Sequence, residues 1–133
     1  MPEPYVALQS VMMPADTNPH GTIFGGVILS AMDMAGAIAA AREVRMAGGR
    51  ADLRFVTVAI NRVEFKQPVF VGDVVRCETT VKKWGRTSVT LHINVISDRL
   101  GVQIPVTEAE VVYVGVDKDR QPVPLLPTVP AAG

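Results

Sequence analysis

The sequence predicts an α+β fold in which one long helix packs against an antiparallel sheet. Residues 23–41 form a nearly continuous apolar run that suits a single long helix. One strand-like segment precedes this run, and four segments rich in β-branched residues follow it with short connections. Strands that follow one another closely pair in an antiparallel sheet, and a long apolar helix can be buried along a face of that sheet.

The elements before the sheet are predicted from turn-forming residues. Residues 5–12 form the expected first strand, which Pro14 ends. Polar turn formers fill residues 16–21, which we expect to be a loop. The helix is expected to begin between residues 24 and 26 and to end near residue 46, because two consecutive glycines follow.

Four strands are expected after the helix. The first covers residues 55–65, where β-branched residues are frequent, and Pro68 closes it. Apolar and polar side chains alternate with a period of two in residues 75–82 and again in residues 89–95. Only a short connection that contains a glycine separates these two strands, so we expect a hairpin. The last strand is expected from about residue 105 to residue 116.

Size, composition and charge limit the possible functions. With 133 residues, of which 48% are hydrophobic and 20% charged, the chain has the size and composition of one globular domain. We assign this domain to residues 1–120 and regard residues 121–133 as a proline-rich tail without a function. Thirteen basic residues balance thirteen acidic ones, so no overall charge recruits nucleic acid or an anionic membrane.

A cytoplasmic protein is expected. The single Cys77 cannot form an internal disulfide, and the start of the chain lacks the positive region and the apolar core of a signal peptide. The apolar run is long enough for a membrane span, but Asp33 near its middle would cost about 3 kcal/mol on insertion. The sequence contains no P-loop, no dinucleotide-binding glycine pattern and no Cys/His cluster, so no metal or cofactor is expected.

Asp33 is the first candidate for chemistry. It is the only charged residue between residues 23 and 41. Its neighbours along the helix are not cationic, so no local ion pair accounts for it; they are Leu29, Ser30, Gly36 and Ala37. An ionised carboxylate without a partner is costly to bury, and such groups concentrate at functional sites. Without the surrounding motif, the simpler interpretation is a structural carboxylate that hydrogen-bonds the backbone or a partner subunit.

The segments around Asp33 resemble the acyl-CoA thioester hydrolases of the hot-dog fold, the YciA-like thioesterase family. The resemblance covers roughly residues 7–118 and is carried by residues 13–26 (MPADTNPHGTIFGG), 32–38, 57–59, 68–75 and 85–88. It implies a curved antiparallel sheet around one long helix, dimers with a continuous sheet, and hexamers built as trimers of dimers. It also implies hydrolysis of a fatty acyl-CoA to a free acid and coenzyme A, which is then part of the substrate and product rather than a cofactor.

The same resemblance assigns roles to four residues. Asp33 matches the acidic catalytic residue, which acts as general base on water or as nucleophile toward the thioester carbonyl. Gly26 matches the residue whose N–H binds the oxyanion at the helix start, although a glycine pair is commonly a helix cap. Asn18 matches a loop asparagine that orients the water or the thioester, although Asn-Pro is also a turn former. Thr57 matches a threonine that supports the site by hydrogen bonding, although threonine is also a good strand residue.

Coenzyme A is expected to contact the chain at two places, residues 86–88 and Gly25. Arg86, Thr87 and Ser88 offer a guanidinium and two hydroxyls, which suit a phosphate or pantetheine, and the alternative is a plain hairpin connection. Gly25 permits close approach at the helix start. Residues 42–54 contain four arginines and exceed the family's usual connection, so they could line the acyl channel, contact coenzyme A or only lengthen a loop.

Assembly and mechanism are linked in this prediction. The helix is too apolar to leave one side in solvent, so we expect a second subunit to cover it. Gly26 and Asp33 lie seven positions apart on one side of the helix, and two-fold pairing would bring Gly26 of one subunit near Asp33 of the other. The alternative function is a non-catalytic acyl-CoA-binding or sensing domain, but such a domain needs no buried base. A hot-dog hydratase would need a histidine beside the carboxylate, and the helix has none.

Overall fold

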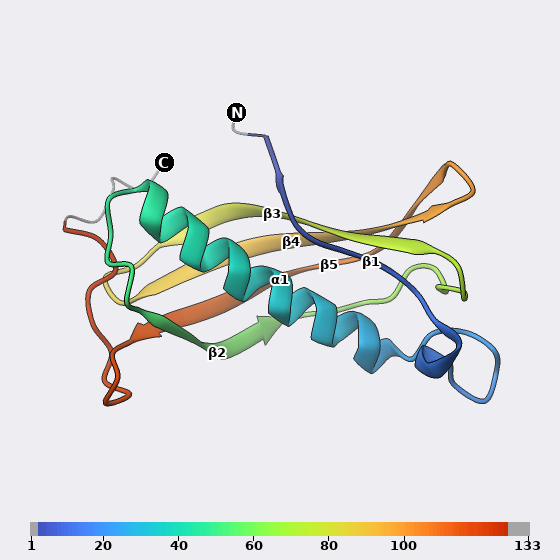
Figure 1. Ribbon diagram of the computed structural model, residues 1–133, viewed down its shortest axis with the longest axis horizontal. Helices are drawn as coiled ribbons and strands as arrows, with labels where there is room; N and C mark the ends of the chain where they lie inside the picture. The colour runs from blue at the N-terminus through green and yellow to red at the C-terminus, as the bar shows by residue number, and fades with distance from the viewer. Residues whose placement is uncertain (1–2, 128–133) are drawn as a thin grey trace.

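Five strands and one long helix make up the described part of the chain, residues 3–127, in a computed structural model (Figure 1). In chain order the elements are β1 (Tyr5–Val11), a short 3₁₀ helix (Pro14–Asp16), α1 (Gly25–Met46), β2 (Arg54–Asn61), β3 (Val74–Trp84), β4 (Ser88–Arg99) and β5 (Val102–Val116). The predicted α+β order of one strand, one helix and four strands is confirmed.

All five strands form one antiparallel sheet in the order β1-β3-β4-β5-β2. Alternate side chains of the three central strands point toward the helix and are inaccessible to solvent; they include Val75, Cys77, Leu91, Ile93, Val111 and Tyr113. Complete burial of one Val, Leu or Ile side chain contributes about 1.5–3 kcal/mol, so this face supplies much of the stability. The strands β1 and β2 are the two edges of the sheet within the described chain.

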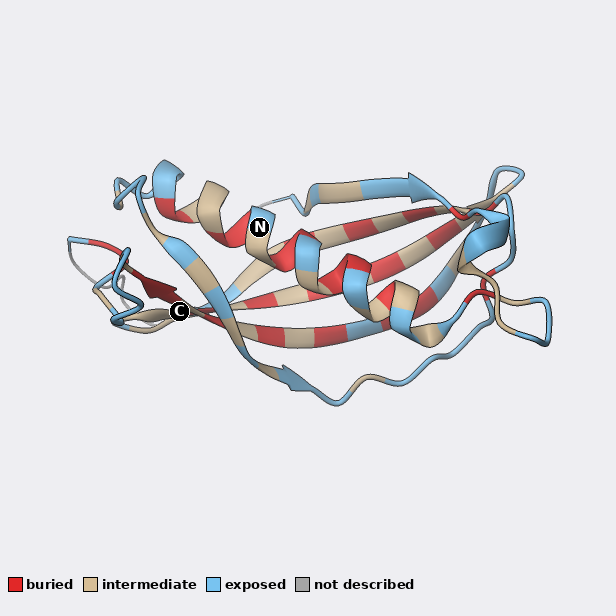
Figure 2. Ribbon diagram, turned by 60° about the horizontal axis from the view of Figure 1, so that its bottom comes forward, coloured by how far each residue is buried: buried red, intermediate tan, exposed pale blue. Residues whose placement is uncertain are grey.

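Helix α1 lies diagonally across one face of the sheet (Figures 1 and 2). Its buried side is built largely from small residues, which let the helix approach the sheet closely; the buried residues are Ile28, Ala31, Met32, Ala35, Gly36, Ala39, Ala40 and Val44. The opposite side exposes 52% of Met34 and 45% of Ile38. A single chain therefore leaves an apolar side of the helix uncovered.

Two hairpins set the register of the central strands. The predicted hairpin joins β3 to β4, and the Gly85 N–H donates to the Ser88 carbonyl in its turn at 2.8 Å. The second hairpin joins β4 to β5 through Leu100 and Gly101, whose φ angles of 53° and 89° are typical of a two-residue hairpin turn. Leucine does not signal such a turn. The strands β4 and β5 are consequently longer than the sequence-based ranges 89–95 and 105–116.

The strand predicted at residues 55–65 is shorter in the structure, because β2 ends at Asn61. The next residue, Arg62, has a left-handed φ of 39°, which turns the chain out of the ladder with β5. The following segment remains beside β5, where the Thr107 hydroxyl donates to the Glu64 carbonyl at 2.6 Å. It belongs to a connection and not to the sheet.

Part of the segment predicted as a tail packs onto the domain. The Leu125 N–H donates to the Arg86 carbonyl at 3.0 Å, and only 1% of Leu125 is exposed. Gly115 leaves the space that the Leu125 side chain occupies. The remaining residues of the predicted tail, 128–133, lie outside the described residues. Within residues 3–127, no helix combines the length and the hydropathy that a membrane span requires.

Candidate active site

The half-buried Asp33 side chain is directed toward β2 and β5. The Thr57 hydroxyl of β2 donates to Oδ1 of Asp33 at 2.5 Å. The Tyr113 hydroxyl of β5 donates to the backbone carbonyl of Asp33 at 2.8 Å and lies 3.3 Å from Oδ1. Thr57 and Tyr113 are paired in the β2–β5 ladder, and the register shifts directly after Thr57. Two hydroxyls from neighbouring strands therefore converge on one residue of the helix.

The second carboxylate oxygen of Asp33, Oδ2, is available for chemistry. No described residue donates a hydrogen bond to it. Because every buried side-chain polar atom of the described residues has a partner, Oδ2 must contact solvent. No Lys, Arg or His of the described chain forms an ion pair with Asp33. The protein thus holds one oxygen and leaves the other free to meet water or a substrate.

Tyr113 and Gly36 belong to this constellation, and sequence reasoning missed both. Tyr113 is completely buried, and burial together with the negative charge of Asp33 raises the pKa of its hydroxyl well above the usual range, so the hydroxyl remains a donor. A Cβ atom at Gly36 would overlap the Tyr113 hydroxyl oxygen. An inward-facing tyrosine in an alternating strand resembles a core residue. The available signal was its hydroxyl, which needs a partner when buried.

The N-terminus of α1 offers unpaired backbone donors. No side chain caps the helix, and the N–H groups of Gly25 and Gly26 have no hydrogen-bond partner among the described residues. Gly26 is exposed, and no atom lies within 4 Å of the position a Cβ would take. Gly25 has less free space around it than Gly26, because the ring of Phe65 lies beside it. The positive end of the helix dipole adds to these donors, so Gly26 can present an N–H to an oxyanion.

Gly26 also borders a groove between α1 and β1. The groove has a volume of about 600 Å³, and its lining includes Leu8, Met12, Ser30 and Met34. From Gly26 to Met34 it follows the helix for about 12 Å. Apolar side chains, hydroxyl groups and the Asp16 carboxylate all line this space.

Asn18 shapes the loop that leads into α1. Its Oδ1 accepts the N–H groups of His20 and Thr22 at 2.9 and 3.1 Å, and its Nδ2 donates to the Thr22 hydroxyl at 2.8 Å. One Nδ2 hydrogen remains for another acceptor. No hydrogen bond joins Asn18 to Asp33 in the described chain. Within one chain, Asn18 acts as a turn former.

The residues predicted to contact coenzyme A lie at two ends of the helix. Arg86 and Thr87 lie in the turn between β3 and β4, and Ser88 begins β4; Figure 1 shows this turn at the same end of the molecule as the C-terminal end of α1. Gly25 begins the helix, which has 22 residues. At 1.5 Å per residue the helix is about 33 Å long. One chain therefore does not bring the turn and the helix start together.

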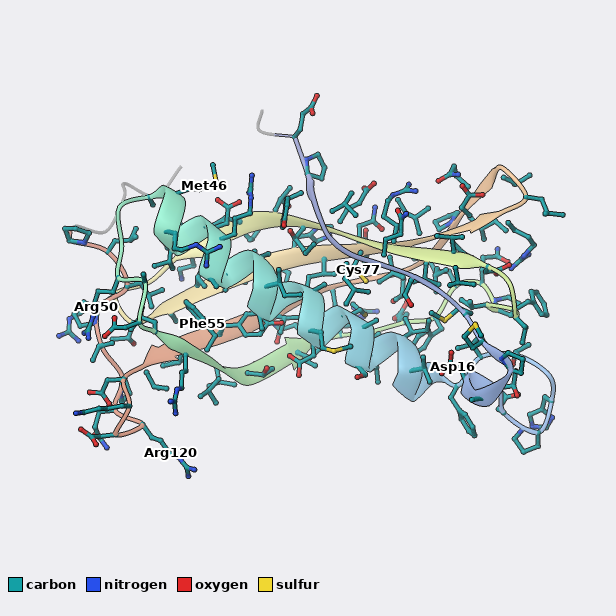
Figure 3. The ribbon with its side chains drawn as sticks, in the orientation of Figure 1. Asp16, Met46, Arg50, Phe55, Cys77 and Arg120 are labelled. Carbon is teal, nitrogen blue, oxygen red and sulfur yellow. The ribbon has the colours of Figure 1, made fainter. Side chains whose placement is uncertain are left out.

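The arginine-rich segment 42–54 lies at the same end as that turn. Figure 3 shows Arg50 there, beyond the end of α1. Arg50 forms an exposed ion pair with Asp52 at 2.8 Å, and the Arg42 guanidinium lies 4.0 Å from the centre of the Tyr5 ring. These two arginines are engaged within their own chain and are distant from the helix start.

Cysteine and histidine do not take part in the Asp33 constellation. Burial raises the pKa of the Cys77 thiol to about 11, so the thiol stays protonated near neutral pH. The Nε2 atom of His92 lies 3.6 Å from a carboxylate oxygen of Glu108, and the side chain is directed away from the helix. Among residues 3–127 no three His, Cys, Asp or Glu side chains are close enough to hold a metal ion. Asp33 is accordingly the candidate catalytic group among the described residues.

The family model of the thioesterase superfamily matches residues 20–104 of the chain. The chain belongs to this superfamily. It is 42% identical to the acyl-CoA thioester hydrolase YciA of Salmonella typhimurium over 129 residues, which are 93% of this chain and 92% of that protein. The corresponding protein of Escherichia coli is 40% identical over 127 residues, which cover 92% of this chain and 91% of its own length.

Solved structures share the fold of this thioesterase superfamily member. The hexameric thioesterase y2039 from Yersinia pestis is 41% identical with a TM-score of 0.83, and the match covers 96% of this chain and 99% of that one. The hexameric hotdog fold thioesterase Cj0915 of Campylobacter jejuni is 44% identical with a TM-score of 0.76, over 92% and 90% of the two chains. The hot-dog fold that the resemblance implied is confirmed.

Proposed function

We propose that this protein is an acyl-CoA thioester hydrolase, which converts an acyl-CoA and water into a free acid and coenzyme A. The observation that carries the proposal is the Asp33 carboxylate, whose Oδ1 is held by Thr57 while Oδ2 remains free. Relatives at 42% identity bear the name of this activity, and a similar solved structure is that of a broad specificity acyl-coenzyme A thioesterase. A free carboxylate oxygen near an unpaired helix N-terminus provides the groups that thioester hydrolysis needs.

Hydrolysis requires attack on the thioester carbonyl carbon and stabilisation of the resulting oxyanion. In the general-base route, Oδ2 of Asp33 takes a proton from water while the water oxygen bonds to that carbon. In the nucleophilic route, Oδ2 itself forms the bond, and water later releases the acid. Both routes use the same free oxygen. In both routes the oxyanion accepts a hydrogen bond from the N–H of Gly26. The C–S bond then breaks, and the coenzyme A thiolate takes the proton held by Asp33 in the general-base route or a proton from water in the nucleophilic route.

The complete site in this proposal lies between two subunits. Gly26 and Asp33 are about 10 Å apart along the axis of one helix, which is too far for one carbonyl group to meet both. Two-fold pairing of helices would place Gly26 of the partner subunit near Asp33 and create two sites in each dimer. Three such dimers would form a hexamer, the assembly named for both solved relatives described above.

Two uncovered apolar surfaces support this assembly. The edge strand β2 exposes 47% of Val56, 56% of Val58 and 39% of Ile60. The outer side of α1 exposes Met34 and Ile38. An open strand edge and exposed apolar side chains both favour association with another chain.

Coenzyme A binding is assigned to the turn between β3 and β4. The exposed Arg86 guanidinium suits a phosphate, and the hydroxyls of Thr87 and Ser88 suit a polar contact with pantetheine. Gly25 leaves the helix start open to the thioester. Since the turn and Gly25 lie at opposite ends of α1, a two-subunit site would draw them from different copies. A reducing cytoplasm suits the free thiol of Cys77.

Thiol release from acyl-CoAs of graded chain length tests this function. The expected result is turnover of at least one member of the series, with a preference among chain lengths. Tight binding of these esters without thiol release from any of them would identify a non-catalytic acyl-CoA-binding domain instead. Light scattering on the same sample measures the assembly, for which we expect the mass of six chains. A fully active monomer would contradict the shared site.

A further inference from the structure

We infer that Tyr113 is a positioning residue for the hydrolysis, because its buried hydroxyl fixes Asp33 so that Oδ2 is the oxygen presented to the substrate. This inference rests on the proposed function and adds a residue that neither the sequence pattern nor the family resemblance assigned. It is carried by three independent features of the structure: the position of the hydroxyl, the glycine that makes room for it, and the strand register that pairs Tyr113 with Thr57.

The Tyr113 hydroxyl meets Asp33 at two points. It lies 2.8 Å from the backbone carbonyl oxygen and 3.3 Å from Oδ1. The first contact anchors the helix turn at Asp33 to strand β5. The second faces the carboxylate oxygen that already accepts the Thr57 hydroxyl. One phenol therefore restrains both the main chain and the side chain of the same residue.

Gly36 permits this contact. It lies one helical turn after Asp33, and any Cβ atom there would overlap both the hydroxyl and the ring of Tyr113. Glycine in the interior of a helix is destabilising relative to alanine. The helix thus has glycine, a residue of low helix propensity, at the position where the Tyr113 hydroxyl reaches Asp33.

The strand register brings the two hydroxyls to the same place. Thr57 is paired with Tyr113 in the β2–β5 ladder, and the register shifts before Ala59 is reached. A slip of one residue in this ladder would turn the affected side chains to the opposite face of the sheet. With the observed register, both hydroxyls face the helix and meet at Oδ1 of Asp33.

This arrangement determines which oxygen reacts. The Thr57 hydroxyl donates to Oδ1, and the Tyr113 hydroxyl holds the backbone carbonyl of the same residue, so the lone pairs of Oδ2 are left for a water proton or for attack on the thioester. When Oδ2 gains a proton or a bond, Oδ1 remains an acceptor. Neither donor then has to move during the reaction, which is the condition for a preorganised site.

Steady-state hydrolysis by Tyr113→Phe tests the inference. The variant keeps the buried ring and removes only the hydroxyl. We expect kcat to fall up to about tenfold, as typical for loss of one neutral hydrogen bond, with KM nearly unchanged. The matched control is Tyr5→Phe at the other of the two tyrosines in the chain, where no hydrogen bond to a described residue is lost. A variant with wild-type kcat and a lowered melting temperature would reduce Tyr113 to a purely structural residue.

A ¹⁹F NMR measurement tests the contact between Tyr113 and Asp33 without relying on activity. In Tyr5→Phe protein grown with 3-fluorotyrosine, Tyr113 is the single fluorinated residue. We expect its ¹⁹F resonance to move when Asp33→Asn is added and to stay in place when the exposed Asp119 is changed to asparagine. An unchanged ¹⁹F chemical shift in the Asp33→Asn variant would contradict the contact between Tyr113 and Asp33.

The outcomes separate this inference from the proposed function. If wild type hydrolyses acyl-CoA, Asp33→Asn does not, and Tyr113→Phe keeps full kcat, only the role of Tyr113 is wrong. If wild type hydrolyses no acyl-CoA, the proposed function fails and the positioning role fails with it. If only KM rises in Tyr113→Phe, the residue contributes to binding and the inference is wrong.

Discussion

The Thr57 hydroxyl donates to Oδ1 of Asp33 at 2.5 Å, across 24 positions of sequence. This contact joins an edge strand of the sheet to the central helix at the residue that carries the free carboxylate oxygen. The same strand, β2, is the edge that we propose for subunit pairing. In the proposed dimer, the strand that pairs the subunits would also orient the carboxylate.

Replacing Thr57 with valine is predicted to lower kcat about tenfold or more, because valine keeps the shape of the side chain and removes the donor to Oδ1. Little change in KM is expected. Thr57→Ser keeps the hydroxyl and should retain most of the activity. Thiol release under saturating substrate measures both variants. Equal kcat values for Thr57→Val and wild type would show that Oδ1 needs no donor from β2.

Gly26→Pro is predicted to fold and to lose activity about a hundredfold or more. Proline is tolerated in the first turn of a helix, and the N–H that it removes has no partner in the described chain. Loss of one oxyanion donor has an effect of this size. Gly26→Ala keeps the N–H, so it should lose less activity than Gly26→Pro. Similar losses in both variants would point to steric obstruction and not to the missing donor.

Val58→Asp is predicted to dissociate the assembly and to abolish most of the activity. Val58 is 56% exposed on the edge strand β2, where a carboxylate would be desolvated by a partner subunit. The matched control is Val102→Asp, because Val102 is 62% exposed at the β4–β5 hairpin. Light scattering and thiol release are measured on both variants. A Val58→Asp hexamer with normal turnover would place the subunit contact elsewhere.

Stability is predicted to depend on the ion pair between the buried Asp73 and the partly exposed Arg99. Burial opposes the charge of Asp73, but the bonds from Arg99, the Phe70 N–H and the Ser97 hydroxyl together place its pKa below the usual range. Arg99→Ala would leave the buried Asp73 carboxylate without its cationic partner. The free energy of unfolding should fall near neutral pH, as measured by urea denaturation.

The control for that prediction is the same unfolding measurement at acid pH. Because the pKa of Asp73 is lower in the folded chain than in the unfolded chain, the carboxylate stabilises the fold above the unfolded value of about 3.9. That contribution is lost as the pH falls through the folded pKa. The difference between wild type and Arg99→Ala should therefore shrink below about pH 4. A difference that does not depend on pH would mean that Arg99 acts through packing alone.

The fold could be predicted because its signals are local. Period-two alternation identified the central strands; the apolar run of residues 23–41 and the two glycines at 48 and 49 identified α1 and its end. The end of β2 at Asn61 could not be predicted, because it follows from a left-handed backbone at Arg62. The two-residue turn at Leu100 and Gly101 was missed for a similar reason, since leucine rarely adopts that conformation.

The site could be predicted only in part. Asp33 was visible as a lone charge in an apolar helix, and the resemblance supplied Thr57 as its neighbour. The role of Tyr113 depends on the register of β2 against β5, which local sequence does not specify. The placement of Arg86 and Gly26 at opposite ends of α1 likewise follows from the three-dimensional arrangement.

The central claim is that the free oxygen of Asp33 performs the chemistry, and kcat of Asp33→Asn tests it most directly. Asparagine keeps the size of the side chain and removes the charge and the basic oxygen. Asp119→Asn, at an exposed carboxylate in the turn after β5, is the matched control. With both proteins folded and equally assembled, we predict a loss of about a hundredfold or more for Asp33→Asn and none for the control. Undiminished thiol release by Asp33→Asn would contradict the account.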